Sequence, residues 1–192
     1  MKLEDALHEI KKCQQHKLQD YSVLQVISDE EFYYPSPVSP VSLGEEGVAN
    51  KFILFSAPGA VGKTALAKHI SHKYGAFYWN VALKPVGGTS FAGEIAHAVG
   101  IGNGTLQDKI YSSLRTGEIL FVLDSFDEAS LISRREGIKD FLEEIGNILD
   151  QPTSPPVIIT ARTEMAKFIV ESCKELHFGV KHYSVDYFSE DD

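Results

Sequence analysis

Short apolar runs alternate with amphipathic stretches along most of this chain. Apolar runs of about four to eight residues are typical of strands buried on both faces of a parallel sheet, and apolar residues spaced by about three or four are typical of helices. The alternation therefore predicts an α/β fold with a doubly wound, mainly parallel sheet of five strands. The predicted strands cover residues 52–55, 76–83, 118–124, 157–160 and 180–187, and the predicted helices cover residues 63–74, 91–99, 105–114, 133–149 and 164–176.

The N-terminal part of the chain has a different pattern. Residues 1–18 carry apolar positions at helical spacing, and residues 21–27 alternate loosely, as in a short strand. Residues 34–47 are rich in Pro, Ser and Gly, which predicts an extended linker. We therefore expect a small N-terminal extension over residues 1–47 and the α/β core over residues 48–192.

A glycine-containing loop follows the first predicted strand of the core. Residues 57–64 read Ala-Pro-Gly-Ala-Val-Gly-Lys-Thr and open a helix, which is the arrangement of a phosphate-binding P-loop. Gly59 and Gly62 let the backbone curl so that its N–H groups point at an anion, and the helix adds its positive N-terminal end. An ordinary glycine-containing turn is the alternative, and it fits the sequence less well. The predicted nucleotide-binding residues are Ala57, Pro58, Gly59, Ala60, Val61, Gly62, Lys63, Thr64 and Ala65.

The side chains of this loop indicate which ligand it binds. Lys63 is expected to contact the β- and γ-phosphates, and Thr64 is expected to offer its hydroxyl to Mg²⁺. Ala57 stands where the usual pattern has its first glycine, and alanine is tolerable there if its φ angle stays negative. The predicted cofactors are ATP or ADP together with Mg²⁺.

An acidic block follows the third predicted strand. Residues 118–128 read Glu-Ile-Leu-Phe-Val-Leu-Asp-Ser-Phe-Asp-Glu, and the apolar run ends in Asp124. Open α/β sheets bind ligands just past the carboxyl ends of their strands, so Asp124 is predicted to hold Mg²⁺ with Thr64, directly or through a water. Asp127 and Glu128 come one short turn later, where either carboxylate can orient and deprotonate an attacking water. The alternative is an acidic helix N-terminus without catalytic work.

A third block, Pro155 to Arg162, is a β-branched strand that ends in a polar residue and an arginine. If this strand lies between the P-loop strand and the Asp124 strand, Thr160 and Arg162 face the γ-phosphate. The guanidinium of Arg162 would then report whether that phosphate is present, because it offers a planar fork of donors. The alternative is an arginine that begins the next helix and faces water. Arg162 joins Asp127 and Glu128 as a predicted catalytic residue.

Taken together, the three blocks resemble the NACHT-type STAND ATPases within the AAA+-related P-loop NTPases. The specific mark is Asp124 followed by a small residue, Ser125, and an acidic pair three and four positions on, whereas ordinary AAA+ motors place the catalytic Glu directly after the Asp. The resemblance covers about residues 48–188. It implies the strand order 5-1-4-3-2, counted from the P-loop strand. It also implies a regulated ATPase switch, in which ADP holds a resting state and ATP permits self-association of the full-length protein. Many bacterial members act in antiviral defence or signalling.

Two other functional classes remain open at this stage. One is a nucleotide-binding scaffold without useful catalysis, which the missing loop glycine permits. The other, a kinase-like phosphoryl transferase, lacks any sign of an acceptor site. Residues 188–192 read Phe-Ser-Glu-Asp-Asp, like the start of a helix. We therefore expect the chain to be a truncated core, with the lid of the family downstream.

Composition narrows the classes further. A chain of 192 residues holds one α/β domain with a modest extension, and its net charge of −9 argues against a dedicated nucleic-acid surface. The two cysteines, Cys13 and Cys173, lack metal-type spacing and do not suggest a disulfide framework. No apolar stretch approaches about 18 residues, and no signal peptide is visible. We expect a cytoplasmic protein that engages neither a membrane nor nucleic acid directly.

Several single residues are assigned structural roles. Trp79, beside Phe77 and Tyr78, is expected to pack in the core, and Lys51 is expected to be an exposed flank of the first strand. The Arg134-Arg135 pair is expected to be solvated at the start of a helix. The helix over residues 91–99 is expected to be capped by Thr89 or Ser90, and His69 and His72 are expected to face solvent without holding a metal.

Overall fold

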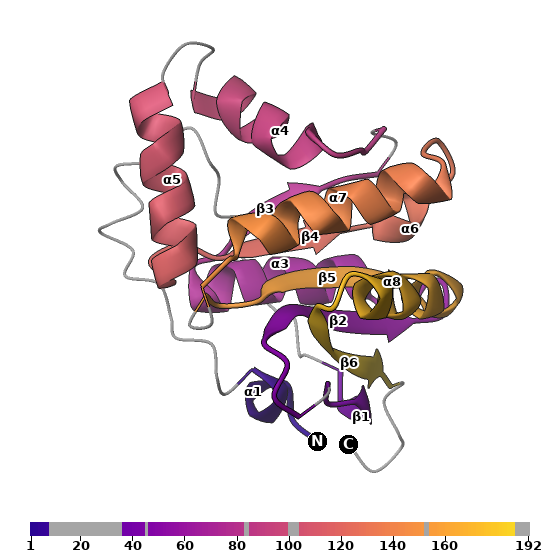
Figure 1. The fold of residues 1–192 in the computed structure, drawn as a ribbon. Helices are drawn as coiled ribbons and strands as arrows, with labels where there is room; N and C mark the ends of the chain where they lie inside the picture. The colour runs from indigo at the N-terminus through magenta and orange to yellow at the C-terminus, as the bar shows by residue number, and fades with distance from the viewer. Residues whose placement is uncertain (8–35, 45, 83–84, 100–103, 152–153, 187–192) are drawn as a thin grey trace.

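A six-stranded mixed sheet with helices on both faces forms the centre of the computed structural model (Figure 1). The structure describes residues 1–7, 36–44, 46–82, 85–99, 104–151 and 154–186. The strands are β1 (Val38–Ser42), β2 (Asn50–Ala57), β3 (Phe77–Asn80), β4 (Phe121–Asp124), β5 (Val157–Arg162) and β6 (Gly179–Val185). The helices are α1 (Leu3–Ala6), α3 (Lys63–Tyr74), α4 (Ser90–Val99), α5 (Gly104–Thr116), α6 (Phe126–Ala129), α7 (Arg135–Ile148) and α8 (Thr163–Glu175).

The strand order corrects the predicted sheet. The whole sheet runs β1-β6-β2-β5-β4-β3, and β1 is antiparallel to β6 while the other neighbours are parallel. The prediction of five strands is therefore wrong in strand number: β1 adds a sixth, antiparallel strand at the edge, so the order of the whole sheet differs from 5-1-4-3-2 and the sheet is mixed. The strands that it counted are β2 to β6, which run β6-β2-β5-β4-β3 inside the larger sheet. Strand β5 lies between β2 and β4, as expected for the strand that ends in Arg162.

The additional strand, β1, comes from the stretch predicted to be a linker. Val38 is fully buried, and the strand pairs with β6 from Val38↔Val185 onward, with an irregularity between Pro40 and Ser42. Proline is tolerated here because an edge strand has a side that needs no ladder N–H. The linker prediction rested on the Pro, Ser and Gly content of residues 34–47, but Pro and Ser are also compatible with a short edge strand. The boundary at residue 48 stays a prediction.

Most of the predicted N-terminal helix and the whole strand predicted over residues 21–27 lie outside the described residues. The described remainder, α1, packs into the core. Leu3 and Leu7 are buried at 2% and 0% exposure in the cluster formed with α3 and β1, and Glu4 forms an ion pair with Lys73 of α3. The beginning of the chain is therefore part of the packed α/β unit.

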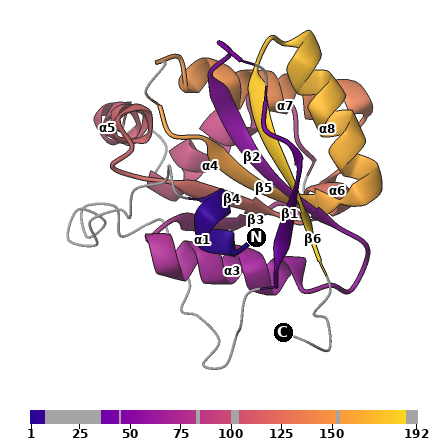
Figure 2. The same cartoon turned by 90° about the horizontal axis from the view of Figure 1, so that it is seen from below.

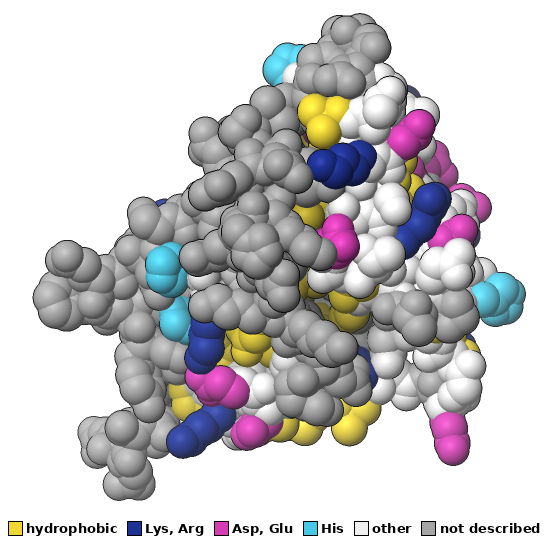
Figure 3. Space-filling view, turned by 90° about the vertical axis from the view of Figure 1, so that its left-hand side faces the viewer, with side chains coloured by type: hydrophobic (Ala, Val, Ile, Leu, Met, Phe, Trp, Pro, Cys, Tyr) yellow, Lys and Arg dark blue, Asp and Glu magenta, His cyan; other side chains and the backbone are white. Residues whose placement is uncertain are grey.

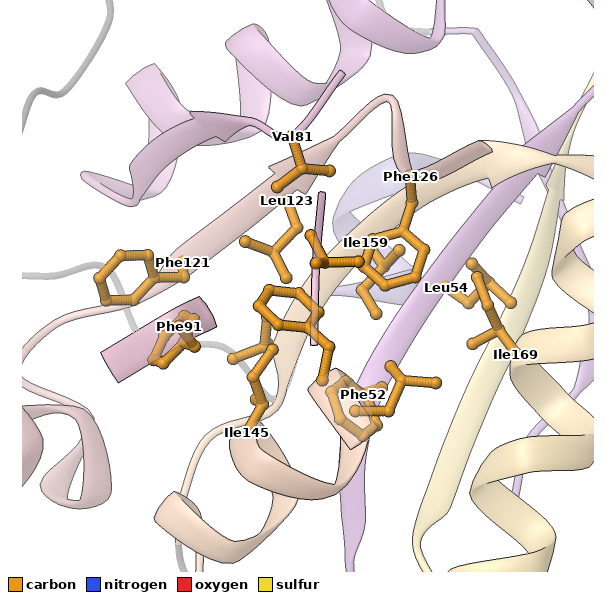
Figure 4. Close-up of a cluster of buried hydrophobic side chains, with 14 of the residues drawn as sticks. Phe52, Leu54, Val81, Phe91, Phe121, Leu123, Phe126, Ile145, Ile159 and Ile169 are labelled. Atoms are coloured by element: carbon orange, nitrogen blue, oxygen red, sulfur yellow. The ribbon is translucent and has the colours of Figure 1, made fainter. Parts of the chain in front are cut away.

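Two buried clusters lie on opposite faces of the sheet. In β2, Phe52 and Leu54 point to the face covered by α4, α5, α7 and α8, while Ile53 and Phe55 point to the face covered by α1 and α3 (Figure 2). Because successive side chains of a strand alternate between faces, a strand buried on both sides must be apolar throughout. Figure 4 shows the first cluster, in which side chains of β2, β4 and β5 meet those of the covering helices.

Helix α3 has the predicted bounds, and α4, α5, α7 and α8 begin and end within two residues of theirs, whereas the short helix α6 was not predicted. The cap predicted for α4 is wrong. The carboxylate of Glu144, on α7, accepts hydrogen bonds from the backbone N–H groups of Phe91 (2.9 Å) and Ala92 (2.8 Å), whereas the hydroxyl of Ser90 accepts from Gly87 N. Burial raises the pKa of the Glu144 carboxyl, while these two hydrogen bonds oppose the rise.

Lys51 is also not an exposed flank. Its side chain is 8% exposed, and its ammonium group donates to the carbonyls of Leu149 and Gln151, just past the end of α7. Burial lowers the pKa of Lys51. A cation at these carbonyls stabilises the C-terminal end of a helix, where the dipole is negative. Both corrections concern partners about fifty to a hundred residues away, which local sequence patterns do not reveal.

Candidate functional site

The loop between β2 and α3 has two residues in the left-handed region. Gly62 has φ 82° and immediately precedes α3, and Ala60 has φ 63°. The expectation placed the curl at Gly59 and Gly62, so the left-handed position at Ala60 is a correction. Ala57 keeps a negative φ, which meets the condition for alanine at the first position. A Cβ atom built on Gly59 or Gly62 would meet no atom within 4 Å, so close packing does not require glycine at either position.

The loop leads into a helix N-terminus that no side chain caps. The first bond into the helix runs from Leu66 N to the carbonyl of Gly62 at 2.9 Å. The amides of Lys63, Thr64 and Ala65 therefore have no carbonyl partner inside the helix, and the dipole adds partial positive charge at the same place. The side chain of Thr64 is exposed beside them. Such a terminus binds anions, phosphates included.

The ammonium group of Lys63 lies across the loop. It donates to the carbonyls of Pro58 at 3.0 Å and Ala57 at 3.4 Å. Among the described residues no carboxylate pairs with it. The loop thus holds a positive charge through neutral carbonyl oxygens, and this charge is available to an anion.

The register of the sheet brings the end of β5 to this loop. Ala57, the last residue of β2, pairs with Arg162, and Phe55 pairs with Thr160. On the other side β5 pairs with β4 through Ile159 and Leu123. The loop, the end of β5 and the end of β4 therefore lie side by side at one edge of the sheet, which is where open α/β sheets bind ligands.

Asp124 is buried at 1% exposure and is held by two hydroxyl groups. Thr160 Oγ1 donates to its Oδ1 at 2.5 Å, and the phenol of Tyr78 donates to its Oδ2 at 2.7 Å. Burial, and then the hydrogen bond to Asp124, raise the pKa of Tyr78 well above its usual value, so the phenol stays protonated and donates. The carboxylate is thus fixed by neutral donors from both neighbouring strands.

This arrangement changes two sequence expectations. Thr160 was expected to face the γ-phosphate, but its hydroxyl is engaged with Asp124. Tyr78 was named only as a neighbour of Trp79, and no role was expected for its hydroxyl group. The sequence does carry a signal: Tyr78 and Asn80 lie at alternate positions of a strand that pairs with the Asp124 strand, which puts their side chains on one face.

The predicted catalytic residues Asp127 and Arg162 bind each other. Arg162 Nε lies 2.9 Å from Asp127 Oδ2, and the backbone N–H of Arg162 donates to Asp127 Oδ1 at 3.2 Å. Only 11% of the Asp127 side chain is exposed, against 55% of the Arg162 side chain. Ser125, with φ 62°, turns the chain after β4 so that short helix α6 returns toward β5. Arg162 precedes α8 and is partly exposed, but its guanidinium is paired with Asp127. The carboxylate of Asp127 is therefore not free either.

Glu128 diverges from Asp127. It is half-buried, and no described residue forms a hydrogen bond or ion pair with its carboxylate. It lines a cavity of about 340 Å³ between α6, α7 and the start of α8. Arg135, expected to be solvated, lies at the same cavity with its guanidinium 5.3 Å from the centre of the Phe168 ring. The other lining residues are Asp127, Ser130, Leu131, Ser133, Ile138, Arg162, Glu164 and Met165.

The residues proposed for Mg²⁺ are a hydroxyl, on Thr64, and a carboxylate, on Asp124. Both are oxygen ligands, which suit a hard divalent cation. In the described ranges no group of three or more His, Cys, Asp or Glu side chains is placed to hold a metal. A small protein donor set fits Mg²⁺ at a nucleotide, because Mg²⁺ there takes most of its ligands from phosphates and water.

Charges are mixed on one face of the molecule. On the face drawn in Figure 3, the described Lys and Arg side chains lie among Asp and Glu side chains and do not gather into one basic patch. The absence of nucleic-acid binding stays a prediction. Among the helices of the described segments, none has both the length and the apolar character needed to cross a bilayer.

Comparison with known proteins gives little further information. No protein-family model matches the chain, and no curated protein matches it. A solved structure of PCH-2 from C. elegans is similar over 73% of this chain and 36% of that chain, with 16% identity and a TM-score of 0.39. The chain thus spans about a third of that protein's length. A likeness this weak carries no argument, so the functional interpretation depends on the site itself.

Proposed function

We propose that this chain binds ATP and ADP with Mg²⁺ at the loop of residues 57–65 and hydrolyses ATP slowly, as the nucleotide switch of a larger protein. The observation that carries the proposal is the meeting of three features at one sheet edge. These are the uncapped α3 N-terminus with Lys63, the buried carboxylate of Asp124 and the Asp127–Arg162 pair. A site for a triphosphate with Mg²⁺ combines positive charge, a carboxylate that binds the metal, and a guanidinium whose planar donors match phosphate oxygens.

Each residue has a definite part in binding. The free amides at the start of α3 and the ammonium of Lys63 bind the β-phosphate region, so Lys63 exchanges the carbonyls of Ala57 and Pro58 for phosphate oxygens. Thr64 and Asp124 hold Mg²⁺. The ion, when bound, neutralises the charge that develops on the phosphate oxygens during transfer.

The Asp127–Arg162 pair supplies the switch. A γ-phosphate next to Arg162 competes with Asp127 for the guanidinium, because phosphate is an equally good bidentate partner. With ADP the pair stays intact, and Asp127 cannot act on a water. With ATP the pair opens, and Asp127 joins Glu128, whose carboxylate no described residue engages, in orienting the attacking water.

The experiment that tests binding is calorimetry of the purified chain with ATP and Mg²⁺. Lys63→Ala is expected to abolish measurable binding while leaving the circular dichroism spectrum and the thermal unfolding midpoint unchanged, since Lys63 contacts loop carbonyls and not the core. Lys68→Ala, a change of the same type on the same helix, serves as the control and is expected to bind like the wild type. Equal affinity of Lys63→Ala and wild type would overturn the proposal.

A nucleotide-binding scaffold without useful catalysis is the second candidate, and one observation favours it. Both oxygens of the Asp127 carboxylate are engaged by Arg162. If ATP does not open this pair, Asp127 cannot contribute to hydrolysis. Single-turnover hydrolysis distinguishes the two candidates: a protein that binds ATP tightly but never cleaves it is a scaffold.

The wider role rests on the resemblance of the motifs alone. A NACHT-type STAND protein would couple ATP binding to self-association of the full-length chain in the cytoplasm, in signalling or antiviral defence. Size measurements of the full-length protein with ADP and with a non-hydrolysable ATP analogue test this part separately from nucleotide binding.

A further inference from the structure

We propose that Tyr78 is a positioning residue for the metal-binding carboxylate: its phenol orients Asp124 toward the N-terminus of α3 without neutralising it. The inference rests on the proposed function, because it concerns how Asp124 meets Mg²⁺. The sequence expectations assigned no role to Tyr78, and none of the residues assigned to the nucleotide site lies on β3.

The geometry places Tyr78 beside Asp124 in the sheet. Strands β3 and β4 pair in parallel with Tyr78 opposite Val122 and Asn80 opposite Asp124, so the phenol reaches two residue pairs along the ladder to Asp124 Oδ2 at 2.7 Å. From β5, on the other side of β4, Thr160 reaches Oδ1 at 2.5 Å. The carboxylate is therefore held from both sides, and its rotation about the Cβ–Cγ bond is fixed.

The face of the sheet supports the same conclusion. Tyr78 packs against the buried cluster that α3 shares with Val122 and Ile158. Asp124 and Thr160 each lie two residues beyond Val122 and Ile158, on the same face by strand alternation. All three polar side chains therefore lie under the helix whose first turn carries Lys63 and Thr64.

The type of donor matters as much as its position. The second carboxylate of the site, that of the partly buried Asp127, is held by a guanidinium, which compensates its charge. Asp124 is held by two hydroxyl groups, which fix its oxygens but leave its negative charge uncompensated. Each carboxylate oxygen accepts more than one bond, so both keep acceptor capacity for a cation. The two neutral donors make Asp124 the carboxylate suited to Mg²⁺, and Arg162 makes Asp127 unsuited to it.

The test compares Tyr78→Phe with wild type by calorimetry, using Mg·ATP and, with a chelator present, metal-free ADP. Outer partners of metal ligands typically contribute on the order of 10- to 100-fold to metal affinity, so Mg·ATP is expected to bind about 10- to 100-fold more weakly. Metal-free ADP is expected to bind as in wild type, because Lys63 and the α3 amides are untouched. Raising the Mg²⁺ concentration is expected to restore ATP affinity, which a distorted site would not allow.

Three further variants sharpen the result. Tyr74→Phe removes a phenol from α3, away from Asp124, and is expected to match wild type with both ligands. Asp124→Asn is expected to show a selective loss at least as large as that of Tyr78→Phe. Thr160→Val, which removes the other hydroxyl that holds Asp124 with little change of shape, is expected to weaken Mg·ATP and spare metal-free ADP in the same way.

The outcomes separate this inference from the proposed function. If wild type binds Mg·ATP but Tyr78→Phe binds it equally well, or loses Mg·ATP and metal-free ADP to the same degree, the positioning role is overturned and the nucleotide site stands. If wild type binds neither ligand, the proposed function fails, and the inference fails with it.

Discussion

The two halves of the candidate site are assembled from different distances along the chain. The loop of residues 57–64 takes its shape from adjacent residues: the left-handed turns at Ala60 and Gly62, the start of α3, and a lysine that folds back onto its own loop. The acidic half takes its shape from three strands, since Asp124 is held by Tyr78 and Thr160. A site can thus have one half that its local sequence specifies and another that only the sheet assembles.

The two halves also differ in how their charges are treated. Positive charge in the loop is left without a carboxylate partner among the described residues, whereas Asp127 is compensated by Arg162 before any ligand arrives. The loop half is therefore ready for an anion, and the acidic half must rearrange. Binding should depend mainly on the first half, and hydrolysis mainly on the second.

The largest expected effect separates these two functions. Replacing Asp127 and Glu128 together by Asn and Gln is expected to slow single-turnover hydrolysis about 10²- to 10⁴-fold, the usual contribution of a positioned base. ATP affinity is expected to stay within a few-fold, because the loop is intact. Unchanged hydrolysis would place the base elsewhere, and a loss of ATP affinity would show that the halves are not separable.

A smaller effect is expected when either partner of the Asp127–Arg162 pair is replaced, and it concerns the preference for ATP over ADP. Arg162→Ala is expected to lower the preference for ATP over ADP about tenfold, the value of one charge-assisted hydrogen bond. Asp127→Asn weakens the competing interaction but leaves Arg162 in place, so it is expected to raise that preference. Calorimetry with both nucleotides measures each ratio. Shifts of the same sign in the two variants would contradict the competition between phosphate and Asp127.

A substitution in the loop is expected to change the free energy of unfolding and to leave the contacts of the acidic half unchanged. Ala60 has φ 63°, a conformation that costs alanine roughly 1–2 kcal/mol but glycine very little. Glycine loses about 0.4–1 kcal/mol more chain entropy on folding, so Ala60→Gly is expected to raise the free energy of unfolding by about 0.5–1 kcal/mol. Urea unfolding measures it. Lower stability would show that the strain at Ala60 is relieved by contacts of its methyl group.

The smallest expected effect concerns a hydrogen bond between the P-loop strand and the neighbouring strand β6. His182, buried on β6, shares a hydrogen bond of 2.7 Å with Ser56, the residue before Ala57. Burial lowers the pKa of His182 below its usual value of about 6.5. The neutral form is therefore favoured in the folded state, so this contribution to stability is complete above about pH 6.5 and is lost as the pH falls through the lowered pKa.

Thermal unfolding between about pH 5 and 8 measures that contribution. His182→Gln keeps a polar side chain that does not titrate in this range, and it is expected to flatten the pH dependence. A variant with the same pH profile as wild type would assign the dependence to another group.

The sequence allowed good predictions where the determinants are local. Helix α3 has its predicted bounds because Gly62 and Gly75, both left-handed, mark its two ends. The position of β5 between β2 and β4 was also expected and confirmed. Of the site, the sequence identified the loop, Asp124, Asp127 and Arg162 as residues that belong together, and the sheet register places them at one edge.

The remaining features depend on partners that no local pattern reveals. Tyr78 and Asp124 are 46 positions apart, and Lys51 and Leu149 are 98 apart. The pairing of Arg162 with Asp127 depends on the turn at Ser125, whose backbone is left-handed. Residues other than glycine seldom adopt this conformation, so the sequence does not predict the turn. Sequence reasoning assigned these side chains by type, and the tertiary contacts decided what each one does.

Strand β1 has a practical consequence for anyone who shortens this protein. A version that begins at residue 48 would lack Val38, Leu3 and Leu7, all of them buried, and would leave the outer row of N–H and C=O groups of β6 unpaired. An uncovered strand edge beside a newly exposed apolar surface is a template for intermolecular pairing. The Pro- and Ser-rich segment therefore covers the edge of β6 as a short outer strand, and a shortened version of the protein should retain it.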